Sequence, residues 1–143
     1  MRFEPLFEEY REGVLECVHY GALVAVNRHG EIIFQKGEAD WTCFYRSASK
    51  PIQALPVIQH GLDARYGLTH EETVLLAGSH AGEACHVAAL ESIFKKTELR
   101  EDMLVMKPAV PAYAPANEER VRQGLPPRSC DRICAGKHAA LML

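Results

Sequence analysis

The stretch Phe44-Tyr45-Arg46-Ser47-Ala48-Ser49-Lys50-Pro51 is where an extended part of this chain is predicted to turn into a helix. Pro51 suits the first turn of a helix, because a residue there needs no backbone donor. Upstream, residues 14–19, 22–27 and 32–35 are rich in β-branched and apolar side chains and are separated by turn residues, which predicts an antiparallel meander. The chain is therefore expected to change from strands to helices at this stretch.

The part of the chain that follows this stretch has the patterns of helices. Residues 52–58 are predicted to be helical, with a kink or an early end at Pro56. Thr69 and Glu72 have the spacing of a capping box, and residues 83–96 form the clearest amphipathic pattern. Strands followed by helices predict an α+β fold in which helices pack on an antiparallel sheet.

The composition limits which classes of protein this chain can belong to. With 143 residues and 48% hydrophobic composition, the chain can bury one modest core, so we expect a single domain over residues 1–143. The net charge of -3 is small and the basic residues are scattered, so we expect no nucleic-acid partner. No apolar run has membrane-spanning length and the start lacks an apolar signal, so the expected location is the cytoplasm, with no membrane partner. The five cysteines lack a disulfide-scaffold rhythm, and most of them are expected to be reduced thiols that act as small core residues.

Ser47 and Lys50 are spaced three residues apart, which places two side chains on one face of a helix. A serine hydroxyl that attacks an acyl carbon needs a base, and a desolvated lysine amine can be that base. The spacing alone is weak, because Ser92 and Lys95 repeat it inside an amphipathic run where solvated side chains are ordinary. The apolar residues before Ser47 favour a buried, positioned hydroxyl at that site.

A second group of small and polar residues precedes the long amphipathic helix, in the order Gly78-Ser79-His80-Ala81-Gly82-Glu83. Small residues let the backbone approach a ligand closely, and a helix N-terminus suits an anionic group. The alternative is an ordinary loop in which Ser79 caps the helix. Glu83 and His86 could bind metal, but a surface pair is the more usual outcome.

Cys130, Cys134 and His138 recur at intervals of four, which on a continuous helix would form a row of metal ligands. The upstream prolines make a continuous helix through Cys130 doubtful, and buried cysteines without a metal are common. Lys137 would lie at a helix start, where a cation is poorly placed for the helix dipole and therefore needs another reason. A zinc site and an ordinary core both remain open at this point.

Taken together, the blocks Arg46 to Pro51, Gly78 to Glu83 and Cys134 to Ala139 resemble the asparaginase II family of the Rhizobium etli type. That family is similar in fold to serine β-lactamases, penicillin-binding proteins and serine glutaminases, with an antiparallel sheet flanked by helices. The resemblance implies hydrolysis of L-asparagine to aspartate and ammonia through a serine acyl-enzyme.

The resemblance also implies roles for eight residues. The catalytic residues would be Ser47 as nucleophile, Lys50 as its base, and Ser79 in proton transfer or substrate placement. The substrate-binding residues would be Arg46, His80 and His138, and a zinc ion would be held by Cys134 and Lys137 with a cysteine from later in the chain. No organic cofactor is implied.

Family members are longer, so the chain is expected to be the N-terminal portion of an incomplete domain, with little or no activity alone. Cys130 is expected to replace the missing zinc ligand beside Cys134. Two other functions stay open: a different serine acyl hydrolase that acts on glutamine or a lactam, and a non-catalytic remnant. The remnant would self-associate, as a homodimer or other homo-oligomer, to cover bare apolar surface.

Overall fold

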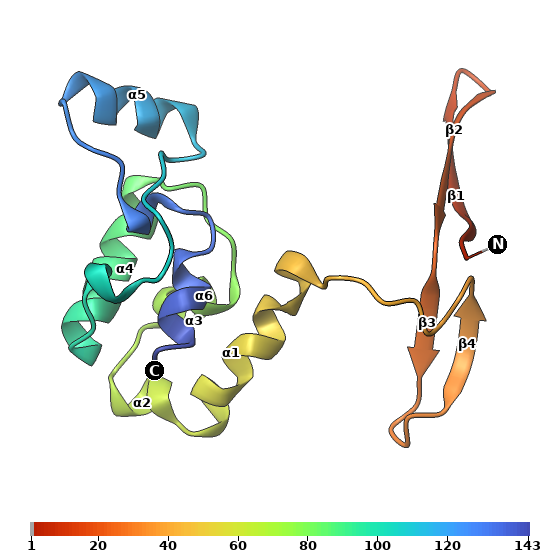
Figure 1. Ribbon diagram of the computed structural model, residues 1–143, viewed down its shortest axis with the longest axis horizontal. Coiled ribbons are helices and arrows are strands. Elements are labelled where there is room, and N and C mark those ends of the chain that lie inside the picture. Colours follow the sequence, from red (N-terminus) through yellow and green to blue (C-terminus); the bar gives the residue numbers. More distant parts are fainter. Residues whose placement is uncertain (1) are drawn as a thin grey trace. The chain divides into compact units, whose positions relative to one another are not determined.

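The computed structural model describes residues 2–143, which divide into two compact units (Figure 1). The first unit extends to Phe44 and contains the strands, and the second covers Tyr45–Leu143 and contains the helices. The predicted α+β class is confirmed. No helix among the described residues combines the length and apolar character needed to cross a membrane.

The first unit consists of two antiparallel hairpins. Strands β1 (Glu4–Arg11) and β2 (Val14–Gly21) pair with each other. Glu12 and Gly13 join them with φ values of 50° and 82°, the left-handed backbone of a tight type I′ hairpin turn. Strand β1 was missed by the sequence analysis, and because β2 pairs with β1, the predicted meander from β2 into the next strand is wrong.

The second hairpin pairs β3 (Leu23–Val26) with β4 (Ile32–Lys36), as predicted. The side chain of Asn27 orders the turn, because its Oδ1 accepts the backbone N–H groups of His29 and Glu31. The unit therefore has two separate two-stranded sheets instead of the single sheet that was expected.

No side chain in residues 2–44 is buried. The ends of the unit are held together by an edge-to-face contact of Phe3 with Trp41 at 4.8 Å and by a hydrogen bond from Glu38 N to the Arg2 carbonyl. Two-stranded hairpins without a core are marginally stable. The core of this chain is thus confined to the second unit.

The helical unit is built around α3, which contacts α1, α4 and α6. Figure 1 labels its helices α1 (Lys50–Gln59), α2 (Leu62–Arg65), α3 (His70–Ala77), α4 (Ala84–Thr97), α5 (Ala114–Arg122) and α6 (Ala135–Ala140). Short 3₁₀ turns lie between them: η1 (Arg46–Ser49), η2 (Glu101–Met103) and η3 (Ser129–Asp131). Of the two outcomes predicted at Pro56, the early end is wrong, because α1 continues through this residue, and the kink stays a prediction.

The capping box predicted for α3 is present. Glu72 N donates to Thr69 Oγ1, and Thr69 N donates to Glu72 Oε2 at 2.7 Å. The same carboxylate accepts from Lys96 Nζ at 2.7 Å, which joins the start of α3 to the end of α4. One buried acidic side chain therefore both begins a helix and ties it to its neighbour.

The core lies between α1, α3, α4 and α6. The face predicted for α4 is confirmed, with Leu90, Ile93 and Phe94 buried. The other core residues are Val57, Leu75, Leu76, Leu104, Cys130, Ala135, Ala139 and Ala140.

Gly136 sets the close approach of α6 to α3. A Cβ at this position would lie 2.1 Å from the Leu75 carbonyl oxygen, so only glycine allows the two backbones to meet there. The segment before α6 is anchored by Arg128, whose guanidinium donates to Glu101 at 2.7 Å, and by Cys130 N, which donates to the same carboxylate at 3.1 Å. Both contacts fix the place where α6 begins.

Candidate active site

Lys50, the first residue of α1, places its amine inside the helical unit. It is 3% exposed, and its Nζ donates to Ser79 Oγ at 2.5 Å and to the Ile133 carbonyl at 3.3 Å. Burial is the main reason that the pKa of Lys50 lies below its ordinary value; nearby Cys134 opposes this shift and Lys137 adds to it. A lowered pKa leaves more of the amine neutral, and only the neutral amine accepts a proton.

Ser79 follows the end of α3 and places its hydroxyl next to Lys50. Gly78 ends the helix in an extended conformation, so the chain turns out of α3 one residue before the serine. Ser79 is an exposed residue, so a ligand can reach it from solvent. The alternative role as a cap of α4 is not observed in the described part of the chain, because the N-cap residue of that helix is Glu83 and the Ser79 hydroxyl contacts Lys50.

A pocket of about 450 Å³ opens beside Ser79, between α3 and α4. Its walls are mostly apolar, and they include Val74, Leu75, Gly78, Ser79, His86 and Ala89. Volumes of this order hold small-molecule ligands. Ser79, whose hydroxyl contacts Lys50, is thus also a wall residue of a ligand-sized cavity.

Ser47 is exposed, so the predicted burial of this hydroxyl is wrong. It lies in the η1 turn, where its carbonyl accepts the backbone N–H of Lys50, and among the described residues its side chain is not paired with the Lys50 amine. The physical reason is that a buried amine needs polar partners. Ser79 and the Ile133 carbonyl supply these partners from inside the unit.

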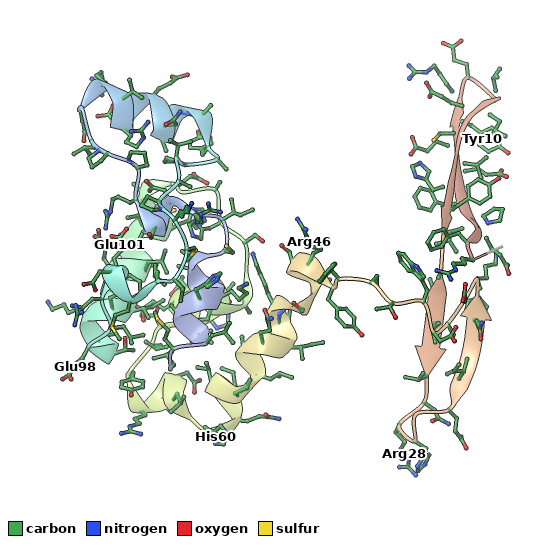
Figure 2. The ribbon with its side chains drawn as sticks, in the orientation of Figure 1. Tyr10, Arg28, Arg46, His60, Glu98 and Glu101 are labelled. Carbon is green, nitrogen blue, oxygen red and sulfur yellow. The ribbon has the colours of Figure 1, made fainter. Side chains whose placement is uncertain are left out.

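Arg46 precedes Ser47 in the same turn and is also exposed (Figure 2). Its φ of 53° is unusual for a residue with a side chain, and its carbonyl accepts Ser49 Oγ at 2.8 Å. Strained backbone is often found at functional sites. The assignment of Arg46 to substrate binding remains a prediction.

His80 is 5% exposed and orders the loop that carries Ser79. Its backbone N–H donates to the Ile133 carbonyl at 3.2 Å, and its Nδ1 accepts from Gly82 N at 3.1 Å. Burial, with the charges of His86 and Lys50, lowers the pKa of His80 to about 4, so the ring is neutral at pH 7. The Ile133 carbonyl therefore joins the His80 loop to the Lys50 amine.

His86 stacks on His80 with ring centroids 5.4 Å apart and lies 3.9 Å from Glu83. Glu83 and His86 lie close to each other, as expected from the sequence, but 3.9 Å is too long for a hydrogen bond between them. Within residues 2–143, the buried Nε2 of His80 and Nδ1 of His86 have no hydrogen-bond partner. Each of these two nitrogens can therefore still form a hydrogen bond, and His86 lines the pocket.

No single helix contains Cys130, Cys134 and His138. The doubt that a continuous helix runs through Cys130 is therefore confirmed. Cys130 lies in η3, whereas Cys134 is the N-cap residue of α6. His138 is half-buried, and its Nδ1 donates to the Cys134 carbonyl at 3.0 Å. Its assignment to substrate binding, like that of His80, remains a prediction.

The residues present fit a zinc site only in part. Cys130 does not fit, because it is fully buried in the core, and burial and Glu101 raise the pKa of its thiol to about 12. Cys134 and Lys137 are half-buried and lie near Lys50. No group of three His, Cys, Asp or Glu side chains in residues 2–143 could hold a metal ion. Two donors fall short of the four that structural zinc takes.

Two features of this site had no signal in the sequence. The first is the Ile133 carbonyl, since a main-chain acceptor is not encoded by a residue type. The second is the pairing of Lys50 with Ser79, residues 29 positions apart, whose contact depends on how α1 and α3 pack. The small residues around Ser79 were the nearest available signal.

Comparison with known proteins gives one positive finding. A protein-family model described as L-asparaginase II matches residues 7–143. That range includes each of the eight predicted site residues. No curated protein matches the chain.

Proposed function

The chain belongs to the L-asparaginase II family, and from this membership we propose that it hydrolyses the side-chain amide of L-asparagine to aspartate and ammonia. The observation that carries the proposal is the buried amine of Lys50, which lies 2.5 Å from the exposed hydroxyl of Ser79. A desolvated amine beside a hydroxyl is an arrangement that supports acyl transfer from an amide.

In the proposed reaction Ser47 attacks the amide carbon, and its proton passes to the neutral amine of Lys50. Ser79, which is hydrogen-bonded to Lys50, passes a proton to the departing ammonia. An aspartyl ester of Ser47 remains. Water then hydrolyses the ester. Because Ser47 is exposed and separate from the amine, the turn η1 must bring it to Lys50 when substrate binds. Catalytic contacts of this kind often tighten only in the complex.

Ammonia release from L-asparagine tests this function. Because the Ser47 hydroxyl is not paired with the Lys50 amine before substrate binds, we expect ammonia to be released slowly. Ser47→Ala and Lys50→Met should each reduce this rate at least about 100-fold. Ser92→Ala and Lys95→Met are matched controls, since they share the spacing but lie in α4, and they should leave the rate unchanged. An unchanged rate in Ser47→Ala would sink the assignment of the nucleophile.

A different serine acyl hydrolase is an outcome of the same experiment. Ammonia from glutamine but not from asparagine, or labelling of Ser47 by a fluorescent penicillin, would assign the chain to that class. Both substrates would use the same hydroxyl and the same amine, so the variants above apply without change.

Zinc binding by Cys134 and Lys137 is a further part of the proposal. Both ligands would have to lose their protons on binding. Metal analysis of the purified chain, with Cys134→Ser beside the unaltered protein, measures it. Stoichiometric zinc that is lost in Cys134→Ser supports the site; no zinc, or zinc that this variant retains, counts against it. Because two ligands are short of a closed site, no step of the reaction is assigned to the metal.

The first unit favours a second candidate function, a non-catalytic chain that associates with itself. No side chain in residues 2–44 is buried, and many large apolar side chains are exposed there, including Phe7, Val14, Tyr20, Ile33 and Phe34. Such surface often marks an interface. Mass measurement in solution separates the cases, because a monomer at all concentrations would exclude self-association.

A further inference from the structure

We propose that Ser79, with Lys50 as its base, is a second reactive hydroxyl of this chain, and that it accepts apolar acyl groups bound in the pocket between α3 and α4. This activity goes beyond amide hydrolysis at Ser47. Both reactions use Lys50 and Ser79, but here Ser79 is the hydroxyl that becomes acylated. Its substrates are activated esters of apolar carboxylic acids.

The contact between the two side chains carries the first step of the argument. Lys50 Nζ and Ser79 Oγ are 2.5 Å apart, and the amine has one other partner among the described residues, the Ile133 carbonyl at 3.3 Å. A carbonyl only accepts, so it takes one N–H of the neutral amine. The lone pair of the nitrogen is then available to the hydroxyl proton of Ser79.

The surroundings of the pair carry the second step. Lys50 is 3% exposed, so its amine is desolvated, whereas Ser79 is exposed, so its oxygen is reachable. Burial also keeps the pKa of Lys50 below its ordinary value. Ser92 offers a contrast within the same chain. It has a lysine three residues on, but Lys95 is exposed on α4 and cannot serve as a desolvated base.

The pocket determines the class of acyl group. Ser79 lies on its wall with the apolar residues Val74, Leu75 and Ala89, and His70 and His86 also line it. Most of the exposed wall is apolar, which suits an alkyl chain, and Glu71 is the one carboxylate among the lining residues that the structure describes. Each buried CH₂ group should increase the acylation rate about fourfold until the pocket is full.

The chemical step balances without any further reagent. Ser79 Oγ attacks the carbonyl carbon of a p-nitrophenyl ester while its proton moves to the neutral amine of Lys50. The new Oγ–C bond forms, and the bond to p-nitrophenolate breaks with its electron pair on the leaving oxygen. Lys50 then loses its proton to solvent and takes one from the water that attacks the Ser79 ester. That proton returns to Oγ, and the carboxylic acid leaves.

The test uses the intact chain with p-nitrophenyl acetate, butyrate and hexanoate. The release of nitrophenolate gives the rate, and mass spectrometry of peptides locates the acyl group. We expect the acyl group on Ser79, a rate that rises from acetate to hexanoate, and a loss of at least about 100-fold in Ser79→Ala and Lys50→Met. Ser92→Ala is the matched control and should react like the unaltered chain.

Two further variants keep the test decisive if Lys50→Met fails to fold. Ser79→Cys should still be acylated, because a thiol replaces the hydroxyl beside the same amine. Ala89→Leu narrows the pocket and should slow hexanoate more than acetate. An acyl group on Ser47 instead of Ser79, an equal rate for the three esters, or reaction that persists in Ser79→Ala would each overturn the proposal.

These assays can refute either proposal without refuting the other. Acylated Ser79 without ammonia from asparagine would leave this inference standing and remove the asparaginase proposal. Ammonia release that needs Ser47, in a chain whose Ser79 is never acylated, would do the reverse.

Discussion

His80 contributes to stability through a ring that stays neutral inside the protein. Its folded pKa of about 4 lies below the ordinary value of 6.5, because of burial and the charges of His86 and Lys50. Between these pH values the unfolded chain binds the extra proton, so the stabilisation is complete above pH 6.5 and is lost as the pH falls toward 4. We expect a loss of at most about 3 kcal/mol over this range.

Urea unfolding at pH 7 and at pH 4.5 measures this loss. His80→Gln should remove most of the difference between the two pH values, because glutamine does not titrate. His60→Gln is the control, since His60 is an exposed histidine at the end of α1 (Figure 2). A pH dependence that is the same with and without His80 would show that its ring is not buried as described.

Gly136 is a second residue on which the site depends. Glycine to alanine inside a helix ordinarily stabilises by about 0.5–1 kcal/mol. Here the added Cβ would lie 2.1 Å from the Leu75 carbonyl oxygen, which forces α6 away from α3. We therefore expect Gly136→Ala to destabilise by about 1–3 kcal/mol, the usual cost of overpacking. Thermal unfolding measures it, with Gly78→Ala as control, because a Cβ there would lie 3.3 Å from its nearest atom. A more stable Gly136→Ala would contradict the close contact.

At the scale of elements, the pair of Glu72 and Lys96 ties α3 to α4. Burial alone would raise the pKa of Glu72, but hydrogen bonds from Lys96, Ser92 and the Thr69 N–H outweigh it and hold the pKa below 4.5. The carboxylate therefore stabilises the fold above pH 4.5, and this contribution is lost as the pH falls through the folded pKa. Its pH window is lower than that of His80.

Glu72→Gln should destabilise the chain by about 2–4 kcal/mol at pH 7, because the amide still serves the capping box but leaves the Lys96 charge without its partner. Adding Lys96→Met should recover part of the loss, and a double-mutant cycle in urea gives the coupling. Glu71→Gln is the matched control on the exposed side of the same turn. Additive effects of the two changes would mean that the pair does not couple α3 to α4.

Elements with local signals were predictable from the sequence. The capping box of Thr69 and Glu72 and the apolar face of α4 depend on residues a few positions apart, and both were found. Strand β1, Glu-Pro-Leu-Phe-Glu-Glu-Tyr-Arg, was missed because it has no β-branched residue and little alternation; its pairing partner defines it. The same limit applies to the site. The spacing of Ser47 and Lys50 is local, whereas the contact of Lys50 with Ser79 depends on the packing of α1 and α3.

At the scale of the whole molecule, burial is distributed unequally. The helical unit holds every buried residue that the structure describes, and the strand unit holds none. Hydrophobic burial is the main force that opposes chain entropy, so the two units should differ widely in stability. The candidate site benefits, because Lys50, Ser79 and Ile133 all belong to the stable unit.

Hydrogen exchange on the intact chain tests this difference. Amides of α3, α4 and α6, which surround Leu76, Leu90 and Ile93, should exchange only through opening of the whole helical unit, whereas amides of β1 to β4 should exchange through local opening with little protection. The reason is that hairpins without a core fluctuate open at little cost. Dilution is the control. If the strand amides are protected and this protection disappears on dilution, a second copy of the chain covers the strands. If the protection persists at every concentration, it contradicts the unequal burial.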